Sequence, residues 1–444
     1  MTSPGFHPVV LGSDLGAYSA ALAFFEQWGV RGTLVTRKVL GPIAGTSIAE
    51  IRKIPTQGED AEYPDYVAGL LKIAPELQEK YPGQKLVLFA NIDTYVWEIV
   101  THVEELEKYY CFNYPTFDVV KRTNSKVEFP ALAEKYGMSV PPTLTIDLDD
   151  GVATVTEQLR SFPHKAPWVI KSALGVGYEM LTWPGKKKVY FVDTLAQAED
   201  LVADLDKHTA EVPNARRFVV QPRIHGNDTY NLCVTAYCDT HGRVTMLSSA
   251  HVLLEDHSPT ALGNPAALIT EPYPGLYEQV ERFLLGVGWT GFANFDCKVD
   301  AKTGKVYFLE INPRVGRSMY YNVAGGINPT EFLVRDLVYG EKVPQRQLSG
   351  RGYMSVLPKC LVMRYVDKRL RRDIRQLHRE GRAHYPFFSK LDLRPSWESL
   401  RRRIYLRLSA QKHWLKFAQN YPMEQHKKIG AQSYHTDELL HDDN

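Results

Sequence analysis

Four residues with complementary chemistry lie close together in the last third of the chain: two carboxylates, an amide and a guanidinium. They are Asp296, Glu310, Asn312 and Arg314. Neighbouring carboxylates repel each other unless a cation lies between them, and hard oxygen ligands without histidine or cysteine suit Mg²⁺. A guanidinium next to such an ion can bind a phosphate or a carboxylate. The residue types therefore predict a magnesium site beside an anion site.

The segments that carry these residues are predicted to form a β-hairpin. Residues 292–299 and 306–311 alternate apolar and polar side chains, and the segment between them has the composition of a tight turn. Pairing of the strands would set Asp296 beside Glu310, with Asn312 on the same face as Glu310. The alternative is a solvated hairpin with scattered charges. The apolar residues of both strands favour a half-buried sheet, where unpaired acids are costly, so we prefer the cation site.

The chain as a whole has the features of a multidomain globular protein. Its 444 residues are too many for a single hydrophobic core and predict roughly two to four domains. The sequence starts without a secretory signal pattern, and no stretch approaches the about 20 apolar residues that span a bilayer. Five cysteines without metal-type spacing predict reduced thiols, and we expect Cys233 and Cys238 to fill the core. These features predict a cytoplasmic protein.

The net charge of +2 hides a basic C-terminal region. Residues 351–428 contain 20 Lys and Arg against 6 Asp and Glu. Part of this region is expected to be an amphipathic helix, because apolar residues recur at helical spacing. These residues are Trp397, Leu400, Ile404, Leu408 and Leu415. Three interpretations stay open: a solvated helix face, contact with an anionic substrate or membrane, and a nucleic-acid surface. We favour the first and do not expect a nucleic-acid partner.

The N-terminal part, residues 8–110, alternates strand and helix signals. Its short apolar runs predict a parallel, doubly wound sheet, whose ligands bind at the carboxyl ends of the strands. Gly12 and Asp14 lie at one such end, and Asn91 and Asp93 lie at another. The Gly-x-x-x-Gly loop is weak evidence for nucleotide binding. A tight turn with Asp14 near a helix N-terminus explains it at least as well.

The middle of the chain places two lysines near loop signals. Lys126 is expected on a helix capped by Asn124 or Ser125. Residues 168–171 predict a strand that delivers Lys171 into the glycine-containing loop 172–177, whose amides could approach phosphate oxygens. This is not a Walker A motif, because the lysine precedes the loop. Residues 218–221 predict a further strand, which Pro222 interrupts.

In order and spacing, these lysines, the segment from Gln221 to Asp228 and the Glu-Ile-Asn-Pro-Arg motif at 310–314 resemble the ATP-grasp superfamily. The resemblance covers roughly residues 115–345. It implies a mixed α/β and α+β chain with a Rossmann-like domain at 1–115 and an ATP-grasp domain at 116–345. That domain would have a small lobe at about 165–225 and a large lobe at about 226–345. A basic, partly helical extension would follow at 346–444.

The resemblance also implies roles for individual residues. Mg²⁺, with Mn²⁺ as an alternative, would be bound by Asp296, Glu310 and Asn312. ATP would be bound by Lys126, Lys171, Gly175, Gln221, Pro222, Arg223, Ile224 and Asp228. Pro222 departs from the family pattern, since many relatives have a glutamate there. Adenine recognition is therefore expected to use the backbone of residues 221–224.

Further motifs resemble a narrower family, the D-aspartate ligases of Gram-positive cell-wall synthesis. The matching segments are 251–259, 263–264, 291–296 and 316–318, together with 11–14 and 93–95. This resemblance implies binding of the amino-acid carboxylates and the acyl phosphate by Arg314, Arg317 and Ser318. His251 would contact the phosphates, with an ordinary strand histidine as the alternative. Asp14, Asp93 and Glu255 are the open choices for a base that deprotonates the amine.

The implied activity is an ATP-dependent carboxylate–amine ligation through an acyl phosphate. The substrates would be D-aspartate, or a similar acidic amino acid, and the lysine amine of a nucleotide- or lipid-linked peptidoglycan precursor. The alternatives are an ATP-grasp ligase with other substrates and a non-catalytic nucleotide- or nucleic-acid-binding protein. The sequence also leaves peripheral membrane contact through the basic C-terminal region open.

Overall fold

The computed structural model describes most of the chain. It leaves out residues 1–3, 57–61, 174–177, 179–180, 213–214, 259–260, 393–396, 431 and 436–444, and the side chains of 397–399. The chain divides into two compact units. The first contains Met1–Val120, Gly226–Cys297 and Ile311–Asn444, and the second contains Lys121–His225 and Lys298–Glu310. The domain boundaries expected from the sequence stay a prediction.

The first unit begins with a parallel five-stranded sheet in the order β3-β2-β1-β4-β5. The strands are β1 (Phe6–Leu11), β2 (Gly32–Thr36), β3 (Ala49–Lys53), β4 (Lys85–Phe89) and β5 (Tyr110–Cys111). All four pairings are parallel, as the apolar runs predict. The helices are α1 (Leu15–Trp28), α2 (Asp65–Lys80), α3 (Asp93–Thr101) and α4 (Val103–Leu106).

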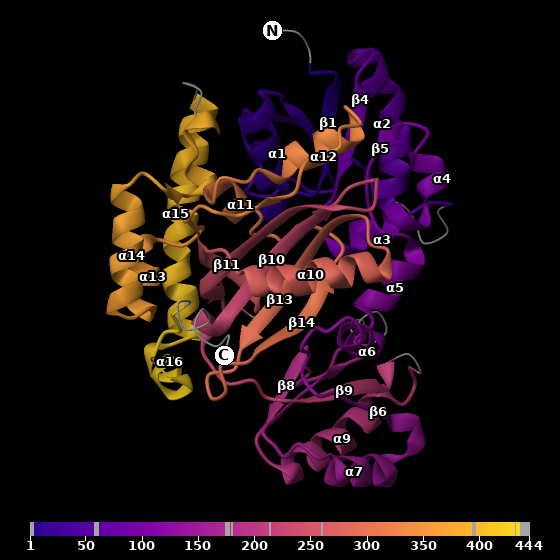
Figure 1. Cartoon of the computed structure of the whole chain (residues 1–444), viewed down its shortest axis with the longest axis vertical. Coiled ribbons are helices and arrows are strands. Elements are labelled where there is room, and N and C mark those ends of the chain that lie inside the picture. Colours follow the sequence, from indigo (N-terminus) through magenta and orange to yellow (C-terminus); the bar gives the residue numbers. More distant parts are fainter. Residues whose placement is uncertain are drawn as a thin grey trace. The chain divides into compact units, whose positions relative to one another are not determined.

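Side chains of β1 point alternately to two cores, as expected for a strand covered on both faces. Phe6 and Val10 pack in the same cluster as the buried residues of α1. Val9 and Leu11 pack with the buried residues of α2 and α3. The sheet is therefore doubly wound, with α1 on one face and α2 and α3 on the other (Figure 1).

A second, mainly antiparallel sheet has the order β14-β13-β10-β11-β12-β16-β17, with β15 paired to β11. Its strands are β10 (Asn231–Cys238), β11 (Val244–Asp256), β12 (Asn264–Thr270), β13 (Gly291–Val299), β14 (Val306–Asn312), β15 (Arg346–Gln347), β16 (Tyr353–Ser355) and β17 (Ala383–His384). The predicted hairpin is thus confirmed as β13 and β14. Helices α10 (Pro274–Val287), α11 (Tyr320–Ala324) and α12 (Pro329–Leu337) accompany this sheet. Cys233 and Cys238 are buried in it, as expected.

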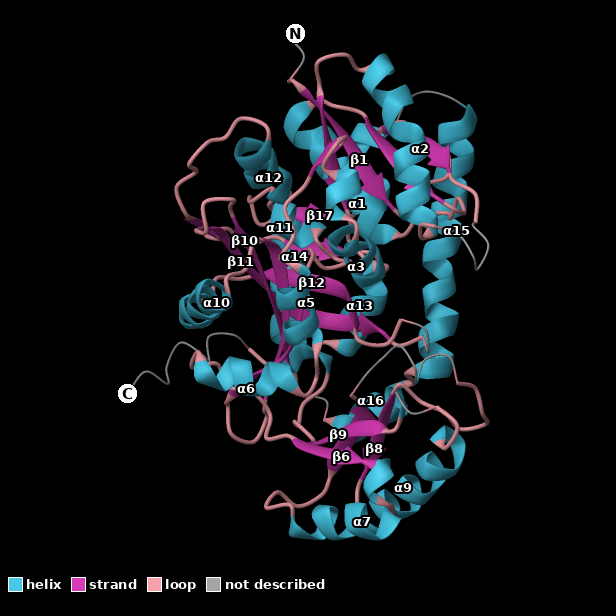
Figure 2. Ribbon diagram, turned by 90° about the vertical axis from the view of Figure 1, so that its right-hand side faces the viewer, coloured by secondary structure: helices cyan, strands magenta, loops and turns pink. Residues whose placement is uncertain are grey.

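The basic C-terminal region is largely helical (Figure 2). Its helices are α13 (Lys359–Tyr365), α14 (Lys368–Arg379), α15 (Trp397–Asn420) and α16 (Met423–Ile429). Asp367 caps α14 by accepting a hydrogen bond from the Leu370 amide at 3.0 Å. Phe417 and Tyr421 pack against Tyr365 of α13 in a core that also contains residues of β11, β12 and β16. None of the described helices is long and apolar enough to cross a membrane.

The second unit is built on a four-stranded antiparallel sheet in the order β6-β9-β7-β8. The strands are β6 (Leu144–Asp147), β7 (Trp168–Ser172), β8 (Val189–Val192) and β9 (Arg217–Pro222). Helices α7 (Val152–Ser161) and α9 (Leu195–Thr209) cover one face, and α6 (Glu128–Lys135) precedes the sheet. Helix α5 (Phe117–Asn124) connects the units along the chain. Lys126 lies in the turn before α6, so its expected place on that helix is wrong.

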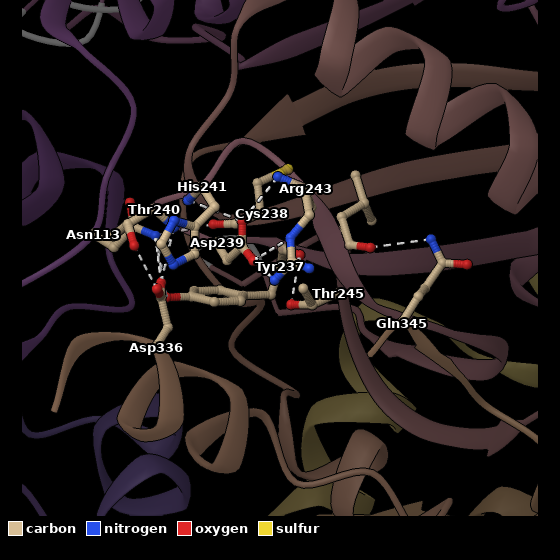
Figure 3. A network of polar contacts seen from close by, with 11 residues as sticks. Asn113, Tyr237, Cys238, Asp239, Thr240, His241, Arg243, Thr245, Asp336 and Gln345 are labelled. Carbon is tan, nitrogen blue, oxygen red and sulfur yellow. Dashed lines mark hydrogen bonds and ion pairs between the residues drawn. The ribbon is translucent and has the colours of Figure 1, made fainter. Parts of the chain in front are cut away.

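A buried carboxylate in the first unit ties three distant segments together (Figure 3). Asp336 of α12 accepts hydrogen bonds from Tyr237 Oη at 2.7 Å, the Thr240 amide at 3.1 Å and Asn113 Nδ2 at 3.4 Å. Its second oxygen accepts from Thr240 Oγ1 at 2.5 Å. The network joins the segment after β5, the turn between β10 and β11, and α12. The cost of burying this charge is offset because four donors surround it.

Replacing Asp336 with alanine should lower the free energy of unfolding by about 3 kcal/mol, because its buried donors would lose their acceptor. Tyr237→Phe removes one donor and leaves the carboxylate bonded to the others, so it should cost only about 1 kcal/mol. Urea denaturation of both variants measures the difference. Equal losses would show that the carboxylate is not the centre of the network.

Candidate functional site

Polar groups gather in the turn that follows the carboxyl end of β1. Gly12 has a φ of 109°, which favours glycine, and its amide donates to Val35 O at 2.9 Å. Asp14 caps α1, since its Oδ1 accepts from the Ala17 amide at 3.0 Å. The capping role left open by the sequence is therefore observed. Asp14 thus follows the carboxyl end of β1, the end of the sheet at which folds of this class bind their ligands.

Asn91, at the carboxyl end of β4, lies against the first turn of α1. Its Nδ2 donates to Asp14 Oδ1 at 3.3 Å. A Cβ added to Gly16 would lie 1.9 Å from Asn91 Nδ2 and 3.4 Å from the Cα of Arg317. Only a glycine therefore allows the first turn of the helix to approach Asn91, while the segment that carries Arg317 lies at ordinary van der Waals distance.

The loop after β14 brings two arginines to this edge. Arg314 Nη2 lies 2.9 Å from Asp93 Oδ2, and Arg317 Nε lies 3.7 Å from Asp14 Oδ2. Arg314 is largely buried, with a side-chain exposure of 16%, while Arg317 is 39% exposed. Residues that are more than two hundred positions apart in sequence thus form one cluster of alternating charge, which we call the sheet-edge cluster: Asp14, Asn91, Asp93, Arg314 and Arg317.

Several polar atoms of the sheet-edge cluster lack partners. Asn91 Oδ1, Asp93 Oδ1 and Arg314 Nε are buried and have no hydrogen-bond partner among the described residues. Buried polar atoms are nearly always hydrogen-bonded, so such a concentration is typical of a ligand site. Two cationic and two anionic groups in one cluster suit a ligand that carries both signs of charge, such as an amino acid.

A polar chain leads from the sheet-edge cluster to the predicted metal ligands. Arg314 Nη2 donates to Asn312 Oδ1 at 3.1 Å, and Asn312 Nδ2 lies 3.2 Å from Asp296 Oδ2. Asn294 Nδ2 contacts the other oxygen of Asp296 at 3.3 Å. Asp296 and Asn312 carry carboxylate and amide oxygens, the ligand types that Mg²⁺ prefers, and here these oxygens accept hydrogen bonds from Asn294, Asn312 and Arg314. Among the described residues, no group of three His, Cys, Asp or Glu side chains is placed to hold a metal ion.

The other predicted phosphate and metal residues belong to the second unit. Lys126 Nζ donates to Ser172 O at 2.8 Å, at the end of β7. Lys171 is partly buried on β7; desolvation lowers the pKa of its ammonium group, while the charge of Glu310 acts in the opposite direction. The structure thus brings Lys126, the end of β7 and the Lys171–Glu310 pair into one unit. Gly175 lies outside the described residues.

The predicted adenine segment begins at the carboxyl end of β9, an inner strand of the same small sheet. Gln221 is opposite Val169 and Lys171 is opposite Val219, so Lys171 and Gln221 share a face. The other face is the core, which contains Trp168, Ile170 and Phe218.

Two local contacts shape this segment. Gln221 Nε2 donates to Thr143 Oγ1 at 2.8 Å, and the Arg223 amide donates to Pro167 O at 2.9 Å. Pro222 is the last residue of β9, opposite Trp168, and Ile224 follows the strand. Since the Arg223 amide is already used, a base bound here would need another backbone group.

Three further predicted residues are engaged inside the first unit. His251 is buried on β11 and its Nε2 lies 2.7 Å from Thr229 O; burial lowers the pKa of its imidazole to about 4. This environment favours the ordinary strand histidine. Asp228 Oδ2 accepts from His257 Nε2 at 2.7 Å and from the Glu255 amide at 2.9 Å. Ser318 is buried two residues before Tyr320, where α11 starts.

Two residues to which the sequence assigned no role complete the geometry, although both lie in segments that match the D-aspartate ligases. Asn294 orients Asp296, and its place two residues earlier on the same strand face is a signal that was available. Tyr95 lies beside the turn of Gly12, because a Cβ there would be 3.4 Å from Tyr95 Cε2. Its hydroxyl lies 2.8 Å from that of Tyr66. Nothing in the spacing of the two tyrosines indicates this contact.

Comparison with known proteins supports the resemblance expected from the sequence. No protein-family model matches the chain. The chain is 28% identical to the D-aspartate ligase of Enterococcus faecium over 388 residues, which cover 85% of this chain and 89% of that protein.

Solved structures identify the fold. The biotin carboxylase domain of the 2-oxoglutarate carboxylase from Hydrogenobacter thermophilus, solved with MgADP and bicarbonate, has a TM-score of 0.56 and 14% identity over 78% of this chain and 73% of that chain. Phosphoribosylamine–glycine ligase from Thermotoga maritima has a TM-score of 0.50 and 16% identity, over 78% of each chain. The fold is that of the ATP-grasp proteins, as predicted.

Gly16→Ala should destabilise the protein although alanine favours helices, because the new methyl group would displace Asn91. Gly275→Ala on α10 is the matched control, since a Cβ there has nothing within 4 Å. The control should gain about 0.5–1 kcal/mol in free energy of unfolding, while Gly16→Ala should lose stability. Thermal unfolding of both variants gives the sign of each change. A stabilised Gly16→Ala variant would contradict the close approach.

Proposed function

We propose that this protein is an ATP-dependent carboxylate–amine ligase that forms an amide through an acyl phosphate. Its amino-acid substrate is D-aspartate or a similar acidic amino acid, and its acceptor is the lysine side chain of a peptidoglycan precursor. The reaction takes place in the cytoplasm, where ATP is available. The observation that carries the proposal is the sheet-edge cluster, which Arg314 connects to Asn312 and, through Asn312, to Asp296.

The cluster suits the recognition of an acidic amino acid. An acidic amino acid such as D-aspartate carries two carboxylates and an ammonium group. Arg314 and Arg317 supply cations for the carboxylates, and Asp14 and Asp93 supply anions for the ammonium group. The similarity to a D-aspartate ligase over most of both chains agrees with this assignment. This assignment uses residues of the first unit alone, so it does not depend on the orientation of the two units.

The nucleotide-binding residues are assigned from the resemblance to the ATP-grasp proteins. We assign the phosphates of the nucleotide to Lys126, Lys171 and the loop containing Gly175, and its base to residues 221–224. Asp228 is assigned to the ribose, although two internal donors already contact one of its carboxylate oxygens. The ammonium group of Lys171 is disfavoured by burial, so a bound phosphate would compensate its charge.

The oxygen atoms of Asp296 and Asn312 fit Mg²⁺, and Glu310 is the third proposed ligand. When bound, the ion neutralises the phosphate oxygens during phosphoryl transfer.

The residues of the chain account for the steps of the reaction. A carboxylate is a poor electrophile until the γ-phosphoryl group of ATP is transferred to it, with ADP as the leaving group. Arg314, held by Asp93 and Asn312, stabilises the negative charge of the acyl phosphate. The acceptor amine then attacks the acyl carbon and phosphate leaves. Asp14 and Asp93 are the acidic groups beside these arginines that can accept the proton of the amine.

ADP release in the presence of ATP, Mg²⁺ and a lysine-containing precursor peptide should depend on the added amino acid and be greatest with D-aspartate. Mass spectrometry should then show the amide product. ADP release that is unchanged across a panel of D- and L-amino acids would contradict the substrate assignment. Binding of ATP without any turnover would favour a non-catalytic nucleotide-binding protein.

Arg314→Gln should lower kcat/KM for the amino acid about a hundredfold, because it removes a cation that faces the acyl phosphate. Arg335→Gln is the control, since Arg335 forms ion pairs with Glu331 and Glu341 of the same region. The control should retain activity within a factor of about two. Steady-state kinetics at saturating ATP measures both, and an Arg314→Gln enzyme as active as the control would contradict the role.

A further inference from the structure

Helix α15 carries an apolar stripe on its outward face, here called the α15 stripe, which the exposed Gln411 interrupts before its last member. It consists of Leu400, Ile404, Leu408 and Leu415, which are 45, 50, 61 and 66% exposed. Their spacing of four, four and seven residues places them on one side of an α-helix. Exposed leucines occur singly on most proteins, but four on one face form an apolar patch that calls for an explanation.

The opposite face of α15 is anchored, so the helix cannot turn to bury the stripe. Arg402 is buried and its Nε lies 3.2 Å from Asp392 Oδ2. Arg402 Nη1 also donates to Ala44 O at 2.9 Å, and the guanidinium lies over the ring of Tyr18 at 4.8 Å. At the other end, Phe417 is buried in the core formed with α13. All these groups belong to the first unit.

Basic side chains border the stripe on both sides. On a helical projection, Arg407 lies on one edge and Arg401, Lys412 and Lys416 lie on the other. These four side chains are exposed. The sequence from 399 to 420 contains six Lys and Arg and no Asp or Glu. The outward face of α15 is therefore apolar along its middle and positively charged along its borders.

We infer that this face of α15 binds the surface of an anionic lipid bilayer. An amphipathic helix of this kind lies in the plane of the interface, with its apolar side chains among the acyl chains and its cations at the headgroups. The helix is the long yellow one in Figure 1, and its 24 residues make it about 36 Å long. The contact is peripheral.

The positive charge along the α15 stripe disfavours a second copy of the chain as the partner that covers it. Two α15 faces packed together would bring their basic borders close to one another without any intervening acid, which is unfavourable. Lipid phosphates supply the missing negative charge. A ligase held at a membrane would also lie close to a lipid-linked acceptor. The inference rests on the helix and does not require the proposed activity.

Sedimentation with vesicles tests the inference on the full-length protein. Vesicles of neutral phosphatidylcholine and vesicles that also contain phosphatidylglycerol are compared. We expect binding to the anionic vesicles that weakens as salt is raised, because added ions screen the basic borders. Ile404→Ser combined with Leu408→Ser should weaken binding at least about tenfold, because two apolar side chains no longer enter the bilayer.

Leu285→Ser is the matched control, because Leu285 is a leucine that is 50% exposed on α10, away from the stripe. It should bind vesicles like the unaltered protein. Thermal unfolding should be unchanged in all variants, since the replaced side chains are exposed. Ligase activity toward a water-soluble acceptor should also be unchanged, which separates a failure of this inference from a failure of the proposed activity.

Three outcomes would overturn the inference. Equal binding to neutral and anionic vesicles would show that the basic borders of the stripe do not contribute to binding. A protein that does not bind vesicles but forms a dimer sensitive to the Ile404 and Leu408 changes would make a second copy the occupant. Vesicle binding that appears only when residues 436–444, which are rich in Asp and Glu, are removed would show that the chain covers its own stripe.

Discussion

The contact between the loop after β14 and the edge of the parallel sheet is the constraint on which the site depends. Arg314 reaches Asp93 and Arg317 reaches Asp14, so the loop that follows β14, the strand of the proposed ligand Asn312, meets the carboxyl ends of β1 and β4. Arginine pairs with carboxylates through directional hydrogen bonds, which orient as well as attract. Without this contact, Asn312 would lose the guanidinium that donates to its amide oxygen.

The surrounding structure keeps this edge in place. Gly16 allows α1 to approach Asn91, and the network around Asp336 joins α12 to the turn between β10 and β11. The core that contains residues of α1 also contains residues of β10, α11 and α12, so the parallel sheet and the larger sheet share packed side chains. Close packing of this kind transmits small displacements, which explains why a single methyl group at Gly16 is expected to matter.

The C-terminal region uses charge in a different way. One arginine of the Arg401–Arg403 run is buried: Arg402 is paired with Asp392, which also accepts hydrogen bonds from Tyr18, Thr46 and Ser47. A buried ion pair that is surrounded by further donors defines orientation more than it adds stability. It determines which face of α15 packs and which face stays outside. The basic residues of the region therefore have two physical roles: the buried Arg402 orients α15, and exposed Lys and Arg side chains border the α15 stripe.

The sequence alone determined the local features of this protein. Apolar patterns identified three of the five parallel strands (β1, β2 and β4), the hairpin of β13 and β14, and α15, because these signals lie within single segments. The types and spacing of Asp296, Asn312 and Arg314 indicated an oxygen-ligand site beside a cation, and the structure places these three side chains in contact.

Only the tertiary structure decided which of the singled-out residues meet. Asp93 and Arg314 are far apart in sequence, and their pairing depends on how two sheets pack, which no local pattern encodes. The inward position of His251 and the exposure of the α15 stripe have the same origin. A sequence shows that a helix has two faces, but the partner against which it packs decides which face is buried.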